Sequence, residues 1–254
     1  ATDAGVIVID NTSAYRMDDK VCLSVPEVNE ADLQKVKETN IVASPNCIAI
    51  PLSMALKPLQ DISKIKRIVA STYQSVSGAG RKAMSELMIQ TKASLMNSEC
   101  KKEYFQKQIA FNLFPHIDNF NKDGVTGEEE KIIEETNKIL DAEIPMAVTA
   151  VRVPVFIGHA ISANIEFENE VAVKDARKAL KDAPGVALVD DVQDETYITP
   201  LETAGEDEVF VSRVRNDPSV EHGLQIWVAA DNLRKGAALN TVHIAESLIK
   251  NNLI

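Results

Sequence analysis

Cysteine is scarce in this sequence, and the spacing of the cysteines matches no disulfide or metal-binding motif. The 254 residues include three cysteines, Cys22, Cys47 and Cys100. They lie far apart and form no CxxC pair, which argues against a disulfide framework or a zinc knuckle. His, Cys and carboxylate residues show no metal-ligand spacing elsewhere. We therefore predict a protein of the reducing cytoplasm that holds no metal.

Positive charge is also in deficit. Lys and Arg number 27 against 38 Asp and Glu, so the net charge is −11. Phosphate backbones are bound by basic surfaces, and the basic residues here are scattered. We predict no nucleic-acid partner. A few local cations can still build a pocket for a small anionic substrate.

Long apolar runs are missing as well. The longest, such as "AVTAVRVPVFIGHAI", are too short and too broken to span a membrane, and no signal peptide is visible. Hydrophobic residues make up 45% of the chain and charged residues 26%. This composition is ordinary for a globular protein of one large domain or two smaller ones.

The first residues, "ATDAGVIVIDNTSAYRMD", contain a β-branched run but no initial Met. "GVIVID" is typical of a strand buried on both faces of a parallel sheet. Such a strand needs neighbours, and nothing before it or close behind it supplies a βαβ partner. We therefore expect the chain to start partway through a domain.

The later pattern mixes helices with several consecutive strands, which predicts an α+β fold with a mixed sheet. Capping residues and apolar periodicity predict helices over 26–40, 46–56, 77–97, 126–140, 174–183 and 235–252. Pro58 is expected to end the second of these helices near Leu56. Short apolar runs predict strands at 41–43, 65–73, 146–157, 185–191, 208–217 and 224–231.

Cys47 is the first candidate for chemistry. It follows Asn46, the expected N-cap of a helix, and a helix N-terminus lowers a thiol pKa and favours the reactive thiolate. A lone cysteine is more often a small core residue. The sequence around it leaves both readings open.

A nucleophile needs a partner, and His159 has the best setting for one. Arg152 lies seven residues earlier, and an odd separation in one strand puts two side chains on opposite faces. Both can reach one site only if the chain bends, which Gly158 permits. "EEEK" at 128–131 is by default an exposed charged helix face. "SVSGAGRKA" at 75–83 matches GxGxxA but lacks the rest of a dinucleotide fingerprint.

Taken together, the segments resemble the bacterial aspartate-β-semialdehyde dehydrogenase family. The resemblance is carried in order by "VIVIDNTSAYRMD", "VPEVN", "NIVASPNC", "TYQSVSGAG", "RVPVFIGHA", "WVAADNLRKGAALN" and "VHIAESL". It implies NADP-dependent reduction of aspartyl-β-phosphate to the semialdehyde and phosphate, in lysine, diaminopimelate, threonine and methionine biosynthesis. It also implies a homodimer. Residues 1–46 would be the remnant of a parallel α/β NADP-binding domain, 47–235 the catalytic and dimerisation domain, and 236–254 a helix returning to the first.

The resemblance also implies roles for individual residues. Cys47 would be the nucleophile that forms a thioacyl-enzyme, His159 the acid/base, and Gln74 the group that orients the substrate. Substrate binding would fall to Arg152 for the α-carboxylate, Glu128 for the α-ammonium, and Lys131, Arg16 and Asn46 for the phosphate. Cofactor contacts would come from Ser75, Gly78 and Asn232.

Two alternatives stay open at this point. Another acyl-phosphate reductase, such as one acting on N-acetylglutamyl phosphate, would use the same thioester chemistry. The chain by itself could also be a non-catalytic module that only dimerises.

Overall fold

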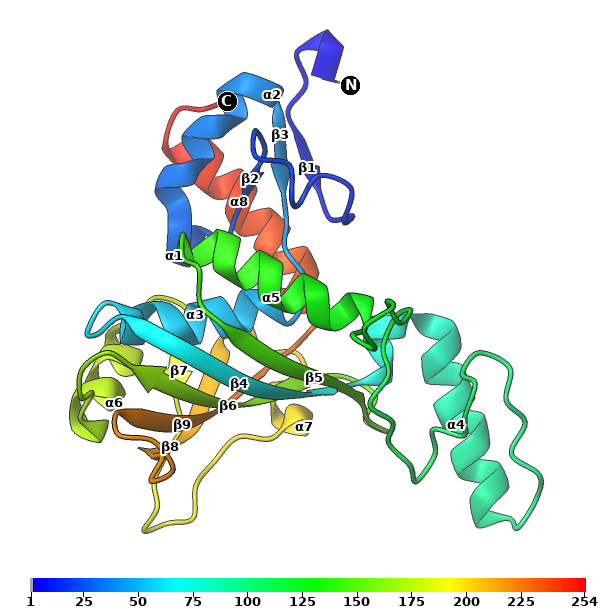
Figure 1. Cartoon of the computed structure of the whole chain (residues 1–254). Helices are drawn as coiled ribbons and strands as arrows, with labels where there is room; N and C mark the ends of the chain where they lie inside the picture. Colours follow the sequence, from blue (N-terminus) through cyan, green and yellow to red (C-terminus); the bar gives the residue numbers. More distant parts are fainter. Residues whose placement is uncertain (1) are drawn as a thin grey trace.

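Two β-sheets of different size organise the chain (Figure 1). The computed structural model describes residues 2–254, and within them nine strands form a three-stranded parallel sheet and a six-stranded mixed sheet. Helices pack on both. The predicted α+β fold, with a mixed sheet and a small parallel one, is confirmed.

The small sheet has the order β1-β3-β2, with β1 at Val8–Asp10, β3 at Ile41–Ala43 and β2 at Cys22–Leu23. Both pairings are parallel. β1 is only partly buried, which corrects the expectation of a strand covered on both faces. Helix α8, Leu239–Lys250, packs on this sheet and is the red helix beside β2 in Figure 1.

The large sheet has the order β5-β4-β6-β9-β8-β7. β4 pairs in parallel with β5 and β8 with β7, and the other neighbours are antiparallel. The strands are β4 Ile65–Gln74, β5 Met146–Arg152, β6 His159–Phe167, β7 Val186–Leu188, β8 Val209–Asn216 and β9 Gly223–Ala230.

Three helices bury one face of the large sheet: α3 (Ala49–Gln60), α5 (Gly127–Leu140) and α6 (Val173–Asp182). Figure 1 shows α3 and α5 lying across it, with α5 between the two sheets. The shorter or peripheral helices are η1 Thr2–Ala4, α1 Pro26–Asn29, η2 Glu30–Lys35, α2 Val36–Thr39, η3 Val76–Ala79, α4 Arg81–Leu95, α7 Pro200–Thr203 and η4 Arg234–Ala238.

Two predicted helices differ from the observed ones. Residues 26–40 form three short helical pieces, because Asn29 binds the backbone of Val25 and Leu23 instead of capping one long helix. Pro58 lies inside α3, which continues to Gln60. The missing N–H of Pro58 falls in the last turn, and Leu59 beyond it is fully buried, so core packing outweighs the usual cost of proline.

One strand was missed and another predicted too long. β6 has no prediction, since "HAISANIEF" alternates weakly and holds several small or polar residues. β5 ends at Arg152 instead of continuing to residue 157, and β6 begins at His159. Arg152 and His159 therefore belong to different strands, on either side of β4.

A buried ion pair joins the small sheet to the end of the large one. The ammonium of Lys235, 1% exposed, lies 2.7 Å from Glu27 Oε2 and donates to Asn240 Oδ1 at 3.0 Å. Asn240 in turn donates to the Ser24 carbonyl and to Ser44 Oγ. The start of α8 is thus tied to the ends of β2 and β3.

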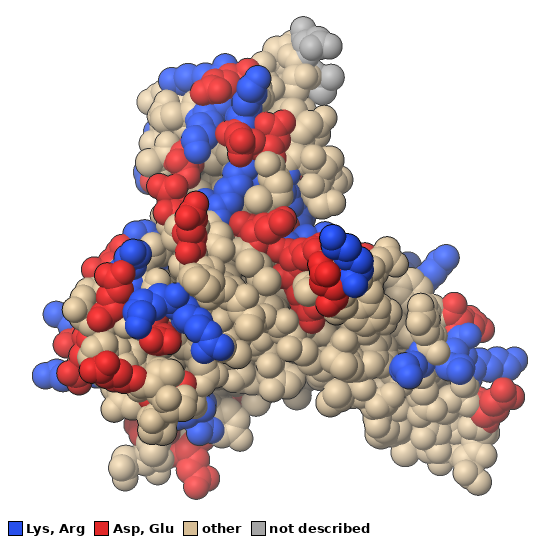
Figure 2. Space-filling view, viewed as in Figure 1, with Lys and Arg blue, Asp and Glu red and all other residues tan. Residues whose placement is uncertain are grey.

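Charged residues of both signs are interspersed over the surface, as one face shows (Figure 2), with a broad zone of other residues between the charged groups. Within residues 2–254, no helix has the length and apolar character needed to cross a bilayer.

The packing of α3 gives a first prediction. Leu56→Ala should lower the free energy of unfolding by about 2–5 kcal/mol, because this fully buried side chain would leave a cavity in the main core. Urea unfolding followed by circular dichroism measures the change. Leu201→Ala, at a leucine 81% exposed, is the matched control and should stay within about 0.5 kcal/mol. Equal losses in the two variants would contradict the assigned core.

Candidate active site

Three neighbouring strands bring three of the predicted site residues to one end of the large sheet. Gln74 ends β4, Arg152 ends β5 in register with it, and His159 begins β6. Gly158 makes the turn before β6 with φ of 91°, and a Cβ there would lie 2.3 Å from the Pro200 carbonyl oxygen, so only glycine fits. The bend predicted at Gly158 therefore exists, between two strands instead of within one.

The segment from β3 to α3 places Cys47. Asn46 Oδ1 accepts from the backbone N–H of Ile48 at 2.8 Å and of Ala49 at 3.4 Å, and its carbonyl accepts from Ile50. These are the bonds of an N-cap, so Asn46 caps the first turn although the regular helix begins at Ala49. Cys47 is partly exposed beside the π-helical turn η4, and a Cβ at Gly236 would lie 3.3 Å from its Cβ.

The predicted lowering of the Cys47 pKa is wrong for this structure. Although the residue as a whole is partly exposed, desolvation of its thiol raises the pKa to about 12, and the Glu128 carboxylate adds to this effect. The charges of Arg152 and Arg16 act in the opposite direction without overcoming it. The free-energy cost of desolvating the thiolate is larger than the stabilisation that the amides of the first helical turn provide. The helix N-terminus therefore does not lower the pKa of Cys47.

His159 is buried, and its two ring nitrogens have different surroundings. Nδ1 accepts from the backbone N–H of Ser75 at 3.1 Å and lies 3.0 Å from Ser75 Oγ. Since a backbone N–H can only donate, the neutral ring carries its proton on Nε2. Among the described residues, nothing accepts from Nε2. Burial first, and then the charge of Arg152, lower the pKa of His159 to about 3.

Arg152 and His159 converge beside Gly78. A Cβ at Gly78 would lie 3.0 Å from His159 Nε2 and 3.3 Å from one terminal nitrogen of Arg152. That nitrogen donates to the Ser75 carbonyl at 2.7 Å, and Arg152 also lines a cleft of about 220 Å³ with Tyr104 and other residues of 79–118. A planar guanidinium at a cleft suits bidentate binding of a carboxylate.

The three consecutive glutamates of α5 have three different environments. Glu128 Oε1 accepts from Asn46 Nδ2 at 3.0 Å and Gln74 Nε2 at 2.9 Å. Glu129 forms a capping box with Thr126 at the start of the helix predicted over 126–140. Glu130 binds the Asn121 amide. The expectation of an exposed charged face is wrong for Glu128 and Glu129, which are 7% and 8% exposed.

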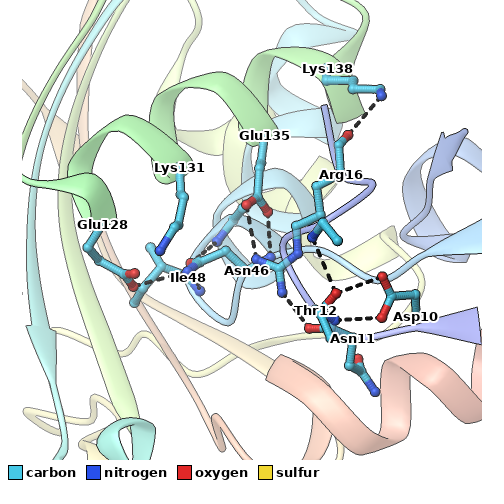
Figure 3. A network of polar contacts seen from close by, with 12 residues as sticks. Asp10, Asn11, Thr12, Arg16, Asn46, Ile48, Glu128, Lys131, Glu135 and Lys138 are labelled. Atoms are coloured by element: carbon cyan, nitrogen blue, oxygen red, sulfur yellow. Dashed lines mark hydrogen bonds and ion pairs between the residues drawn. The ribbon is translucent and has the colours of Figure 1, made fainter. Parts of the chain in front are cut away.

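Arg16 reaches the same region from the loop after β1 (Figure 3). Its guanidinium donates to Glu135 Oε1 at 3.0 Å and to the Asn11 carbonyl at 2.8 Å. Glu135 Oε2 also accepts the backbone N–H of Asn46, next to Cys47. Burial raises the pKa of Glu135, against the opposing charge of Arg16. The buried carboxylate of Glu135 thus binds both the Arg16 guanidinium and the backbone N–H of the residue that precedes Cys47.

Lys131 projects from the same face of α5, between Glu128 and Glu135 in Figure 3. Its ammonium lies 2.6 Å from Asp118 Oδ2. The structure therefore gathers the predicted phosphate ligands Arg16, Asn46 and Lys131 along the face of α5 between Glu128 and Glu135.

Two of the predicted cofactor ligands, Ser75 and Asn232, belong to a buried cluster behind His159, whereas Gly78 is exposed. Asn232 Oδ1 accepts from Ser75 Oγ at 3.1 Å, from Ser77 Oγ at 3.1 Å and from the Gly158 N–H at 3.0 Å. These contacts hold the Ser75 loop against the start of β6. The roles of Ser75, Gly78 and Asn232 toward a cofactor stay predictions.

The small sheet nevertheless has features that fit a dinucleotide. β1 and β3 are parallel neighbours, and the exposed residues 11–13 and Cys47 both follow their carboxyl ends. Doubly wound sheets bind dinucleotides at that edge. In the described part of the chain, no cluster of three or more His, Cys, Asp or Glu could hold a metal ion.

Comparisons with known proteins identify this arrangement. A family model described as "Semialdehyde dehydrogenase, dimerisation domain" matches residues 56–235, and one described as "Semialdehyde dehydrogenase, NAD binding domain" matches 1–36. The aspartate-semialdehyde dehydrogenase of Rickettsia typhi is 55% identical over 253 residues, 100% of this chain and 75% of its own length. That of Aquifex aeolicus is 52% identical over 98% of this chain and 74% of its length.

The chain belongs to the aspartate-semialdehyde dehydrogenase family. The structure of aspartate semialdehyde dehydrogenase II from Vibrio cholerae agrees, with a TM-score of 0.95 and 43% identity over 98% of this chain and 74% of that one; it has also been solved complexed with ASA. The predicted family and dehydrogenase activity are confirmed. The cofactor is confirmed as a nicotinamide dinucleotide.

Two residues that contact this candidate site carried no prediction. Glu135 lies seven residues after Glu128 and four after Lys131, so helical periodicity alone places all three on one face. Asp118 lies in an irregular segment, where no sequence period relates it to Lys131.

The protonation of His159 gives a second prediction. An unfolded chain binds a proton there below the ordinary pKa of 6.5, whereas the folded chain does so only near 3. Stability should therefore fall as the pH drops from 6.5 toward 3. Between about pH 7.5 and about pH 5 this one group should cost about 2 kcal/mol.

His159→Gln keeps an acceptor for the Ser75 N–H but cannot take up a proton in this range. Its loss of unfolding free energy between these two pH values should be smaller than that of the wild type by that amount, measured by urea unfolding. An identical pH dependence in both proteins would show that His159 is not held neutral.

Proposed function

We propose that this chain catalyses NADP-dependent interconversion of aspartyl-β-phosphate and aspartate-β-semialdehyde through a thioacyl intermediate on Cys47. The proposal assigns Cys47 as nucleophile, His159 and Gln74 to the reacting group, and Arg152, Glu128, Lys131, Arg16 and Asn46 to the substrate's charged groups. The reaction would belong to the biosynthesis of the aspartate-derived amino acids and would take place in the cytoplasm.

One observation carries the proposal. Glu128 and Arg152 both lie close enough to Cys47 for their charges to shift its pKa, in opposite directions. An α-amino acid presents an ammonium and a carboxylate close together, so these two side chains match it in sign and number. A substrate held by both would have its side-chain carbonyl near the sulfur.

The acyl-transfer step requires the thiolate. Pairing of the substrate ammonium with Glu128 offsets one of the charges that oppose ionisation of Cys47. The thiolate attacks the acyl carbon, and the bond from that carbon to the phosphate oxygen breaks as phosphate leaves. Arg16 has a buried Nε without an acceptor among the described residues, and with Lys131 it would balance the departing charge.

His159 serves the oxyanion that develops at the same carbon. Its Nε2–H is unpartnered and lies beside Arg152, so it can donate to that oxygen. The neutral tautomer supports the donor half of the predicted acid/base role. The Ser75 N–H on Nδ1 fixes the ring for this role, as outer hydrogen bonds do in other histidine sites.

The bound cofactor, as NADPH, would supply the hydride that reduces the thioester to the thiohemiacetal and would leave as the oxidised dinucleotide. The chain's own part is then to stabilise the new oxyanion through His159 and to release the aldehyde as the Cys47 sulfur leaves. We infer NADP instead of NAD from the family resemblance. Steady-state rates with each dinucleotide test this preference.

The central test replaces the nucleophile. Cys47→Ser should lower turnover by at least about 10³-fold, because an alcohol is a far weaker nucleophile than a thiolate at neutral pH. NADPH formation from the semialdehyde and phosphate measures it. Cys100→Ser is the control and should turn over normally. Turnover of Cys47→Ser close to the wild type would remove Cys47 from the mechanism.

The same assay separates the alternatives. Turnover of N-acetylglutamate semialdehyde in preference to aspartate semialdehyde would favour the other acyl-phosphate reductase. Absence of turnover together with dimer formation would favour a module that only dimerises.

We also propose that the chain forms a homodimer through the face of the large sheet opposite α3 and α5. The dimerisation-domain match covers this sheet. Ser71 of β4, Ser162 of β6 and Trp227 of β9 form one cross-strand row of partly exposed residues on that face. The small side chains of Ser71 and Ser162 would let a second sheet approach closely beside Trp227.

Ser162→Arg tests the dimer face. An arginine there should weaken dimerisation by at least about tenfold, because a charge would be buried between two sheets. Sedimentation equilibrium measures the dissociation constant. Ser98→Arg, at an exposed position after α4, is the control. An unchanged dimer in Ser162→Arg, with native circular dichroism, would place the interface elsewhere.

A further inference from the structure

The cation that the proposed function assigns to phosphate already has an anionic partner. Lys131 Nζ lies 2.6 Å from Asp118 Oδ2, and both side chains are about one-third exposed, at 34% and 36%. Asp118 comes from the irregular segment between α4 and α5, and it also lines the cleft that holds Arg152. It therefore stands where both ends of the substrate would bind.

Three features of the backbone hold Asp118 in this place. Its φ is 70°, a left-handed conformation that aspartate tolerates better than most residues. The next carbonyl, of Asn119, accepts the Gly127 N–H at 2.9 Å. A Cβ at Gly127 would lie 2.9 Å from Asp118 Oδ2, so the carboxylate can approach the first turn of α5 only because that residue is glycine.

The charges reinforce this placement. The hydrogen bond from Lys131, and then the Asn119 N–H, hold the pKa of Asp118 below its usual range. The positive end of α5 favours the same carboxylate. Asp118 is thus an ionised group fixed on the ammonium that phosphate would need.

We propose that Asp118 sets the phosphate affinity of the active site by competing with the substrate's phosphate group for Lys131. This inference rests on the proposed function, in which Lys131 binds phosphate. An acyl-phosphate reductase must release inorganic phosphate in every cycle. When phosphate dissociates, the Asp118 carboxylate can pair with Lys131 again. This competition weakens the binding of the phosphate product, whereas a Lys131 without such a partner would bind it more tightly.

Asp118 acts through Lys131 and is a positioning residue, not a catalytic one. Glu135 has a comparable relation to Arg16, but it is buried and also holds the Asn46 backbone. Its replacement would disturb the fold, whereas the exposed Asp118–Lys131 pair contributes little to stability. Asp118 is therefore the position where anion affinity can be changed without loss of structure.

The test measures inorganic phosphate directly. Asp118→Asn should bind phosphate about three- to tenfold more tightly than the wild type, because a competing negative charge is removed. Isothermal titration of the full chain with phosphate reports binding, and steady-state assays should show a lower KM for phosphate with less change in kcat. Asp118→Glu should restore weak binding. Asp123→Asn, in the same segment, is the matched control.

The outcomes separate this inference from the function beneath it. Unchanged or weaker phosphate binding in Asp118→Asn would overturn the competition. Tightening by Asp118→Asn that persists equally in a Lys131→Met background would also overturn it, since the effect would not pass through Lys131. Lys131→Met alone should weaken phosphate binding. If it does not, the phosphate role of Lys131 in the proposed function fails instead.

Discussion

The candidate active site depends on the buried carboxylate of Glu135. It neutralises Arg16 from the loop after β1 and accepts the backbone N–H of Asn46 from the end of β3. A buried charge is stable only when it is paired and hydrogen-bonded, so these two contacts require each other. Together they fix the small sheet, the start of α3 and the middle of α5 in one arrangement. Cys47 is held by that arrangement more than by any contact of its own sulfur.

Helix α5 distributes charge along a single face. Glu128 faces Asn46 and Gln74, Lys131 faces Asp118, and Glu135 faces Arg16. Lys131 and Glu135 are paired with opposite charges and Glu128 is hydrogen-bonded by two amide groups, so each charged group of this helix face has polar partners in a partly buried site. This arrangement also explains the high pKa of Cys47, because little net positive charge is left near the sulfur to offset its burial.

Sequence patterns predicted most of the helices and strands but not the residues at which they begin and end. The capping box at Thr126 places the start of α5 because its two bonds are local. The predicted ends of α3 and β5 differ from the observed ones. Proline and β-branched residues have local conformational preferences, and packing against buried neighbours overrides them here. β6 was missed because its small and polar residues carry little signal until β4 and β9 lie on either side.

The amino-acid sequence by itself determined the fold class, the family and the residue types of the site, because strand and helix periods are local and the motifs around Cys47 and His159 are specific. Only the tertiary structure decided which charges meet. Arg16 forms an ion pair with Glu135, and Lys131 forms one with Asp118. The Ser75 N–H fixes the tautomer of His159. These contacts join residues that lie far apart in the chain. Electrostatic energies depend on distance and burial in three dimensions, and no spacing along a sequence specifies either.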